Sequence, residues 1–171
     1  RLWRIRRSAA AVIWQNKSVA KALPIIEDAA VPVGEFVPFL ENAYRLFEKE
    51  HLKFAVWGHA GDANFHIQPF FNLSKQHDRD KVFKVIDEFY SMVIEMGGTT
   101  AGEHNDGRLR APFLPKLYGQ DVYRIFREVK HLFDPLNILN PGVKIDVDME
   151  VNKKQLRHEY SMPNLDGNQP H

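Results

Sequence analysis

The sequence predicts an α+β fold in which helices back an antiparallel sheet. Apolar residues recur at helical spacing over residues 35–50 and 78–96, as in amphipathic helices. Two short apolar segments, 54–57 and 65–71, flank a glycine-containing turn, which is typical of a β-hairpin. With a strand predicted over 25–33, the order along the chain is strand, helix, strand, strand, helix. This order suits an antiparallel sheet covered by helices.

The N-terminal half opens with a predicted helix over residues 1–14, where apolar and basic positions are mixed. The strand over 25–33 ends at Pro32, because proline cannot donate a backbone hydrogen bond. Pro38 lies in the first turn of the 35–50 helix, where a missing N–H is tolerated.

The C-terminal half contains the helix over 78–96, which stops at a pair of glycines, and a third helix predicted over 121–133. A loop with a short strand at 99–101 joins them. We assign the aromatic residues of the three helices after residue 34 to the hydrophobic core. From residue 146 onward the chain is polar without a sustained apolar pattern, which indicates a tail or linker.

Composition limits the classes of protein and partner. With 171 residues, 44% of them hydrophobic, the chain suits one domain with a substantial core. A net charge of +1 argues against nucleic acid as a partner. The absence of cysteine excludes disulfides and thiolate metal sites, and no apolar run approaches the length of a membrane span. The chain opens without Met or a signal peptide, so we expect a piece of a longer protein.

Chemically active side chains gather in two stretches, GHAGDANFH over residues 58–66 and GGTTAGEHNDG over residues 97–107. Glycine allows backbone conformations closed to other residues and lets a ligand approach the main chain. We therefore interpret the two stretches as one functional site. Its candidate residues are His59, Asp62, Asn64, His66, Glu103, His104, Asn105 and Asp106.

Two histidines and one glutamate of these stretches are candidate metal ligands. His59, His66 and Glu103 form a two-histidine, one-carboxylate set, which leaves positions open for a substrate. His104 is a candidate general base, since the histidine pKa suits proton transfer near neutral pH. The alternative is a turn with surface donors and an exposed charged loop, because the spacing of the two histidines is not specific. From the residues alone, both interpretations stay open.

The arginines near these stretches also allow two interpretations. Arg108 and Arg110 follow the second stretch, where charged side chains are usually solvated. An arginine turned inward could instead hold a substrate carboxylate through two hydrogen bonds, and the same applies to Arg6. No phosphate-binding glycine motif is present, so another segment must hold most of any nucleotide or flavin.

Several motifs resemble one known family. GHAGDANFH is similar to the GHxGDGNxH motif of the C-terminal domain of FAD-linked oxidases, in the vanillyl-alcohol-oxidase superfamily. That group includes D-lactate and D-2-hydroxyglutarate dehydrogenases and the glycolate oxidase FAD subunit. GGTTAGEHNDG resembles GGxxxGEHGxG, and FDPLNILNPGVKI resembles DPxxILNPGKI. LWRIR and EDAAVP also resemble family segments in the right order, so the likeness covers residues 2 to about 145.

The resemblance implies a ferredoxin-like α/β plait over residues 1–145, which would be the cap or substrate domain, followed by a polar tail or linker over 146–171. It also implies an FAD-binding domain that precedes this chain and belongs to the same protein. The GEHNDGRLR and FREVKHLFDP wording resembles large bacterial members that carry an iron–sulfur region downstream. We expect a cytoplasmic protein, peripheral to the membrane through its electron-transfer partners.

The resemblance also assigns roles to residues. It implies oxidation of a small 2-hydroxy acid, of the D-lactate, D-2-hydroxyglutarate or glycolate type, with hydride transfer to FAD. A divalent metal, Zn or Mn, would be bound by His59, His66 and Glu103, and His104 would be the base beside the flavin. The resemblance further implies that Gln68 makes a polar contact with the substrate and that Arg6 binds the substrate carboxylate. Asn140 would belong to the segment of the chain that returns towards the flavin.

Two positions depart from the family pattern. Ala63 and Asn105 stand where the motifs have glycine, and asparagine tolerates left-handed backbone conformations more readily than alanine. Two other function classes compete with the flavoenzyme interpretation, namely a non-catalytic ferredoxin-like binding module and a metal-dependent hydrolase. The joint presence of His59, His66, Glu103 and His104 favours the flavoenzyme over the binding module.

Overall fold

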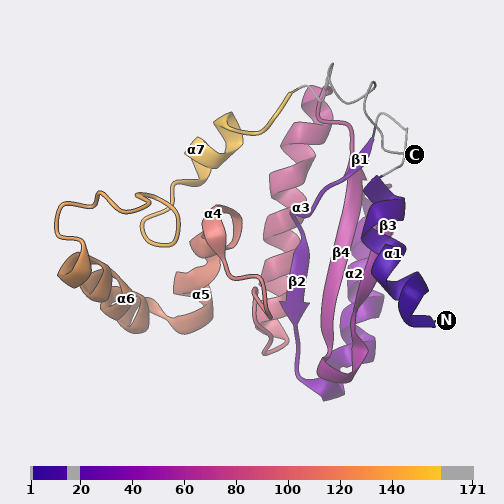
Figure 1. The fold of residues 1–171 in the computed structure, drawn as a ribbon, viewed down its shortest axis with the longest axis horizontal. Coiled ribbons are helices and arrows are strands. Elements are labelled where there is room, and N and C mark those ends of the chain that lie inside the picture. The colour runs from indigo at the N-terminus through magenta and orange to yellow at the C-terminus, as the bar shows by residue number, and fades with distance from the viewer. Residues whose placement is uncertain (1, 15–19, 159–171) are drawn as a thin grey trace.

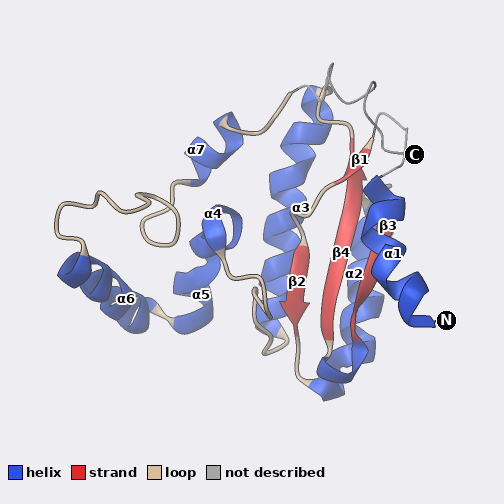
Figure 2. Ribbon diagram, viewed as in Figure 1, coloured by secondary structure: helices blue, strands red, loops and turns tan. Residues whose placement is uncertain are grey.

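The computed structural model describes residues 2–14 and 20–158, and the predicted α+β fold is confirmed there (Figures 1 and 2). The strands are β1 (Lys21–Ala22), β2 (Glu27–Ala30), β3 (Phe54–His59) and β4 (Asn64–Phe71). β4 is the centre of the sheet and pairs antiparallel with each of the other strands. β3 and β4 form the predicted hairpin, with His59 opposite Asn64 at its closed end.

The sheet follows the order expected of a ferredoxin-like plait. An antiparallel bridge between Ala30 and Thr99 lies beside β2, in place of the short strand predicted at 99–101. The order across the sheet is therefore Thr99, β2, β4, β3. Along the chain, one long helix connects β2 to β3 and another connects β4 to Thr99. This is the split βαβ arrangement.

Two long helices, α2 (Phe36–Lys49) and α3 (Gln76–Glu95), cover one face of the sheet, as Figure 1 shows. Phe39 of α2 and Phe89 of α3 are fully buried, with ring centroids 5.8 Å apart. Side chains alternate along β4, so Phe65 and Ile67 join this core. The intervening polar residues of β4 must therefore project from the opposite face of the sheet, where the candidate site lies.

The C-terminal part begins with α4 (Gly107–Arg110) and α5 (Leu114–Tyr118) and continues with α6 (Gln120–Phe133). Short 3-10 turns lie at Val33–Glu35, Ala60–Asp62 and Ala111–Phe113. The helix predicted over 121–133 is confirmed as α6, but the assignment of its aromatic residues to the core is wrong. None of its residues is buried, and Phe133 is 79% exposed. The physical reason is its position, because α6 lies beyond α5, away from the sheet (Figure 1).

Two terminal helices complete the described chain. The predicted N-terminal helix is present as α1 (Leu2–Trp14). The segment expected to be a polar tail contains a short helix, α7 (Met149–Lys154), whose first turn is capped by Asp148. Met149 and Leu156 pack against the core, which sequence periodicity missed because so short a helix shows no apolar repeat. Among the described helices, none combines the length and hydrophobicity that crossing a membrane requires.

β2 is interrupted by a bulge at two adjacent acidic residues. Its register against β4 shifts between Glu27, which pairs with His66, and Ala29. The intervening Asp28 has a φ of 67°, in the left-handed region that residues other than glycine rarely adopt. A bulge of this kind changes the direction in which the side chains of a strand point. Here it is the local reason why two neighbouring carboxylates serve different partners.

Tyr90 of α3 holds the bulge in place. Its hydroxyl donates to the carbonyl of Glu27 at 3.0 Å and accepts from the N–H of the same residue at 3.3 Å. Tyr90 is fully buried, and burial raises the pKa of its hydroxyl, which therefore stays neutral. One side chain from the helical layer thus satisfies both backbone polar groups of Glu27.

We predict that Tyr90→Phe lowers the free energy of unfolding by about 1–3 kcal/mol, because the buried polar groups of Glu27 lose a partner. Denaturant unfolding measures the change. Tyr44→Phe is the matched control, since Tyr44 is 37% exposed, and it should alter stability by less than about 0.5 kcal/mol. Equal effects of the two substitutions would contradict the role of Tyr90 in holding the backbone of Glu27.

Candidate functional site

A single buried carboxylate anchors the loop that carries two of the candidate site residues. Asp28 is fully buried and accepts hydrogen bonds from the backbone N–H of Glu103 at 3.0 Å and of His104 at 2.7 Å. Its own carbonyl accepts from the N–H of Gly102 at 2.7 Å. The GEH segment, residues 102–104, is therefore fixed against β2 through its main chain. The side chains of Glu103 and His104 are free to face the sheet.

Gly102 is required by the closeness of this docking. A Cβ atom added there would lie 2.3 Å from the side-chain nitrogen of Asn64 and 3.2 Å from a carboxylate oxygen of Asp28. The same nitrogen of Asn64 donates to Asp28 at 3.2 Å. A larger residue at position 102 would therefore displace the side chain of Asn64 and its hydrogen bond to Asp28.

Arg110 is turned inward, onto the protein's own carboxylates. It is buried, and its guanidinium lies 3.1 Å from an oxygen of Asp28 and 3.8 Å from one of Glu27. Burial alone would raise the pKa of Asp28, but hydrogen bonds from the loop and from Asn64, with the charge of Arg110, hold it below its usual value. Arg110 is therefore not solvated, but its partners are carboxylates of the protein, so the structure does not test whether an arginine holds a substrate carboxylate.

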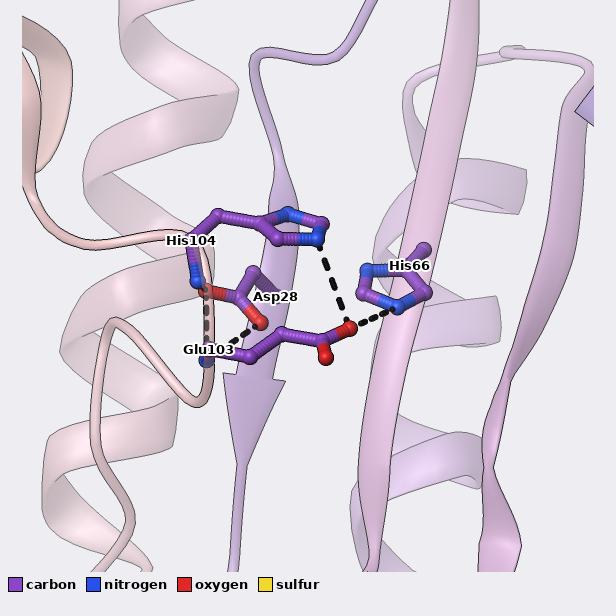
Figure 3. A group of neighbouring side chains, drawn as sticks. All are labelled: Asp28, His66, Glu103 and His104. Carbon is purple, nitrogen blue, oxygen red and sulfur yellow. Dashed lines mark hydrogen bonds and ion pairs between the residues drawn. The ribbon is translucent and has the colours of Figure 1, made fainter.

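Three histidines converge on one oxygen of Glu103. The Nε2 atom of His66 lies 3.0 Å from Oε1 of Glu103, and those of His59 and His104 each lie 3.3 Å from it. The rings come from β4, from the end of β3 and from the loop, and Figure 3 shows two of them beside Glu103. The predicted cluster of His59, His66, Glu103 and His104 is thus present at one point.

The other ring nitrogens of two of these histidines are bound by Glu27. Its carboxylate lies 3.1 Å from Nδ1 of His66 and 2.9 Å from Nδ1 of His104. Burial would raise the pKa of Glu27, but the hydrogen bonds to His66 and His104 and the nearby positive charges lower it. The hydrogen bond to Glu27 raises the pKa of His104 against the opposing effect of burial.

The donor set fits a divalent cation. A carboxylate accepts hydrogen bonds only, and a neutral imidazole that donates through Nδ1 presents a lone pair at Nε2. The lone pairs on Nε2 of His66 and His104 would then face the carboxylate oxygen of Glu103, so that only hydrogen-bond acceptors meet. Protons or a cation must lie between them, and imidazole nitrogen with carboxylate oxygen suits zinc and manganese.

Asp28 also belongs to this cluster by distance but not by chemistry. Ligand atoms of Asp28, His66, Glu103 and His104 all lie within 4.8 Å of one another. Both oxygens of Asp28 already accept hydrogen bonds from the loop, and one of them also pairs with Arg110. We therefore infer that Asp28 anchors the loop, and that the atoms available to bind an ion belong to the histidines and Glu103.

Three further predicted residues lie differently. Gln68 is buried two positions along β4 from His66, and its side-chain oxygen has no hydrogen-bond partner among the described residues. Arg6 lies on α1, and Asn140 is exposed beyond α6 with a φ of 47°. Within the described ranges, no hydrogen bond or ion pair joins Arg6 or Asn140 to the cluster, so their roles stay predictions.

Both departures from the family motifs adopt the conformation expected of a glycine. Ala63 has a φ of 47° at the hairpin turn, and Asn105 has a φ of 68° in the loop. Reasoning from single residues missed Glu27 and Asp28, which entered only as part of a family motif. The available signal was two adjacent carboxylates inside the apolar run IIEDAAV, where burial demands partners.

Comparison of the sequence with known proteins points to one family. The sequence model for FAD linked oxidases, C-terminal domain, matches residues 1–143. Similar proteins include a D-2-hydroxyglutarate dehydrogenase of Haemophilus influenzae, 31% identical over 83% of this chain and 14% of that protein. Glycolate oxidase subunit GlcD of Bacillus subtilis is 32% identical over 80% of this chain and 28% of its own length. A D-lactate dehydrogenase of Archaeoglobus fulgidus is 32% identical over 67% of this chain and 25% of its own length, so the chain spans a small part of each relative.

We predict that Asp28→Asn lowers the free energy of unfolding by about 3–5 kcal/mol, because the charge of Arg110 then stays buried without its closest partner. Denaturant unfolding gives the number. Asp121→Asn removes a carboxylate that is 98% exposed and 3.9 Å from Arg124, and it should change stability by less than about 0.5 kcal/mol. A similar small loss for Asp28→Asn would rule out the anchoring role.

We predict that His104 of the metal-free protein titrates above its ordinary pKa of 6.5, and that Glu27→Gln lowers this pKa. Because the folded-state pKa is raised, the stability contributed by the His104–Glu27 pair is fully present below the ordinary value. It is lost as the pH rises through the raised pKa. An NMR titration of the ring protons checks this, and a His104 pKa at or below 6.5 would contradict it.

Proposed function

We propose that this chain, which belongs to the family of FAD-linked oxidase C-terminal domains, forms the substrate side of a flavin-dependent oxidoreductase acting on a small 2-hydroxy acid. The observation that carries the proposal is the convergence of three Nε2 atoms on Glu103. The names of the relatives, D-2-hydroxyglutarate dehydrogenase, D-lactate dehydrogenase and glycolate oxidase subunit, indicate the class of substrate.

The metal-binding residues in this proposal are His59, His66 and Glu103, and the ion is Zn²⁺ or Mn²⁺. Such an ion supplies Lewis-acid polarisation of the hydroxyl and carboxylate oxygens of a 2-hydroxy acid. The protein supports this arrangement with two donors from the hairpin and one from the anchored loop. Since β3 and β4 are paired up to His59, their pairing sets the backbone positions of both histidines.

His104 is the base in the same proposal. Its Nδ1 side is occupied by Glu27 at 2.9 Å, so only Nε2 can take the hydroxyl proton of the substrate. Glu27 then stabilises the imidazolium that forms, in accord with the raised pKa of His104. The hydrogen bond from the backbone N–H of His104 to Asp28 holds the main chain, and Glu27 holds the ring through Nδ1.

The redox step requires a flavin, which supplies an acceptor for the hydride at C2 of the substrate. We propose that an FAD-binding domain of the same protein covers the apolar face of α6. The exposed side chains that support this are Val122, Ile125, Val129, Leu132, Phe133, Leu136, Ile138 and Leu139. So many exposed apolar side chains on α6 and in the segment directly after it are typical of an interaction site. Asn140 directly follows these apolar residues and would lie near the flavin. We also propose an iron–sulfur region downstream of this chain.

The substrate contacts in the proposal begin with Gln68. A buried amide oxygen without a partner is costly, so a donor from a bound ligand would satisfy it. Gln68 shares a strand face with His66, which places it along the same side of the sheet. Arg6 is proposed to bind the substrate carboxylate once the rest of the protein is in place.

The metal site is tested by calorimetry with Zn²⁺ and Mn²⁺. We predict one equivalent bound by the wild-type chain and none by a His59→Ala/His66→Ala variant. His77→Ala/His131→Ala removes two exposed histidines outside the cluster and should leave binding unchanged. Binding that survives in the first variant, or that is lost in the control, would refute the assignment of these ligands.

The base is tested in the full-length protein loaded with FAD. We predict that His104→Ala lowers kcat for a 2-hydroxy acid by about 10²–10⁴-fold, the usual contribution of a general base, while metal content stays the same. Steady-state kinetics with D-lactate, D-2-hydroxyglutarate and glycolate gives the loss. Unchanged turnover in this variant would exclude His104 as the base.

A further inference from the structure

The carboxylate of Glu27 is shared by two histidines that have different proposed roles. Oε2 lies 3.1 Å from Nδ1 of His66, and Nδ1 of His104 lies 2.9 Å from Oε1 and 3.0 Å from Oε2. The two rings stack with centroids 4.8 Å apart. Glu27 lies on β2 and is only 9% exposed, so water does not compete with the two histidines for its carboxylate. His59, the other histidine of the cluster, has no such contact among the described hydrogen bonds.

Glu27 is itself held rigidly. Tyr90 binds both its N–H and its carbonyl, and Arg110 donates to the same carbonyl at 3.1 Å. The guanidinium of Arg110 also lies 3.8 Å from the carboxylate, which favours the ionised form. Each neutral imidazole has one N–H, and an ionised carboxylate can only accept, so both rings must carry their proton on Nδ1.

We infer that Glu27 is a shared positioning residue that sets one tautomer in both the metal ligand His66 and the base His104. The inference rests on the proposed function and adds a residue to it. With both protons on Nδ1, the lone pairs of both Nε2 atoms face the same point beside Glu103, at 3.0 and 3.3 Å from its oxygen. A single carboxylate thereby prepares the metal site and the proton acceptor together.

Glutamine at position 27 discriminates this role from simple packing. An amide has nearly the same shape as the carboxylate but offers one acceptor oxygen and one NH₂ donor. In either orientation of the amide, its NH₂ group faces Nδ1 of at least one ring, because Nδ1 of His104 lies 2.9 Å from one oxygen of Glu27 and 3.0 Å from the other. A ring whose Nδ1 accepts from the NH₂ group must carry its proton on Nε2, which removes that atom as a ligand or base.

The experiment is a long-range ¹H–¹⁵N spectrum of the metal-free protein, recorded at a pH where the rings are neutral, for wild type and Glu27→Gln. We expect both His66 and His104 as Nδ1–H tautomers in the wild type, and at least one of them as Nε2–H in the variant. Zn²⁺ or Mn²⁺ affinity should fall by about 10–100-fold, as for other residues that orient metal ligands.

Glu50→Gln is the matched control. Glu50 is also a buried carboxylate, 7% exposed, and it pairs with Lys84 at 2.6 Å in a part of the fold remote from the cluster. This substitution should leave both tautomers and the metal affinity unchanged.

Two results would overturn the inference. One is an Nε2–H tautomer of either ring in the wild type, which decides the matter even if Glu27→Gln fails to fold. The other is a folded Glu27→Gln protein with both tautomers and the metal affinity unchanged. Wild-type protein that binds neither metal would refute the proposed metal site, whereas the tautomers would still report on Glu27.

Discussion

The whole site depends on one buried carboxylate, that of Asp28. Burying a charge is costly unless it is paired and fully hydrogen-bonded, and Asp28 meets both conditions through Arg110 and the N–H groups of Glu103 and His104. The bulge in β2 turns this side chain towards the loop, while Glu27 one position earlier is available to the histidines. Without the carboxylate of Asp28, the backbone N–H groups of Glu103 and His104 would lose the acceptor that holds them against β2.

The cluster is arranged for something that must sit between its own polar atoms. Glu103 and the imidazole Nε2 atoms of His66 and His104 approach within 3.0–3.3 Å, although both kinds of atom accept hydrogen bonds when Glu27 holds the Nδ1 protons. Such an arrangement is unfavourable unless protons or a cation separate the acceptors. The anchoring of strand, hairpin and loop therefore maintains a site that either protons or a cation must complete, and in the proposed function this is preorganisation for a metal ion.

Sequence periodicity was sufficient for the helices and the hairpin because their apolar patterns are long and regular, as in α2 and α3. The cluster itself was also foreseeable, because its histidines and Glu103 lie in glycine-containing stretches. The bulge at Asp28 was not, since a positive φ in a non-glycine residue leaves no periodic trace. Helix α6 shows a different limit: an amphipathic pattern predicts that one face is covered, but it does not say by which part of the protein.

In the proposed site, His59, His66 and Glu103 together bind one divalent ion while His104 remains beside it as a base. Anomalous diffraction from crystals loaded with Mn²⁺ or Zn²⁺, measured at the absorption edge of the metal, tests this claim most directly. We expect one strong peak within bonding distance of Nε2 of His59, Nε2 of His66 and a carboxylate oxygen of Glu103. A peak elsewhere on the protein, or a peak bound by His104 in place of His59, would contradict it.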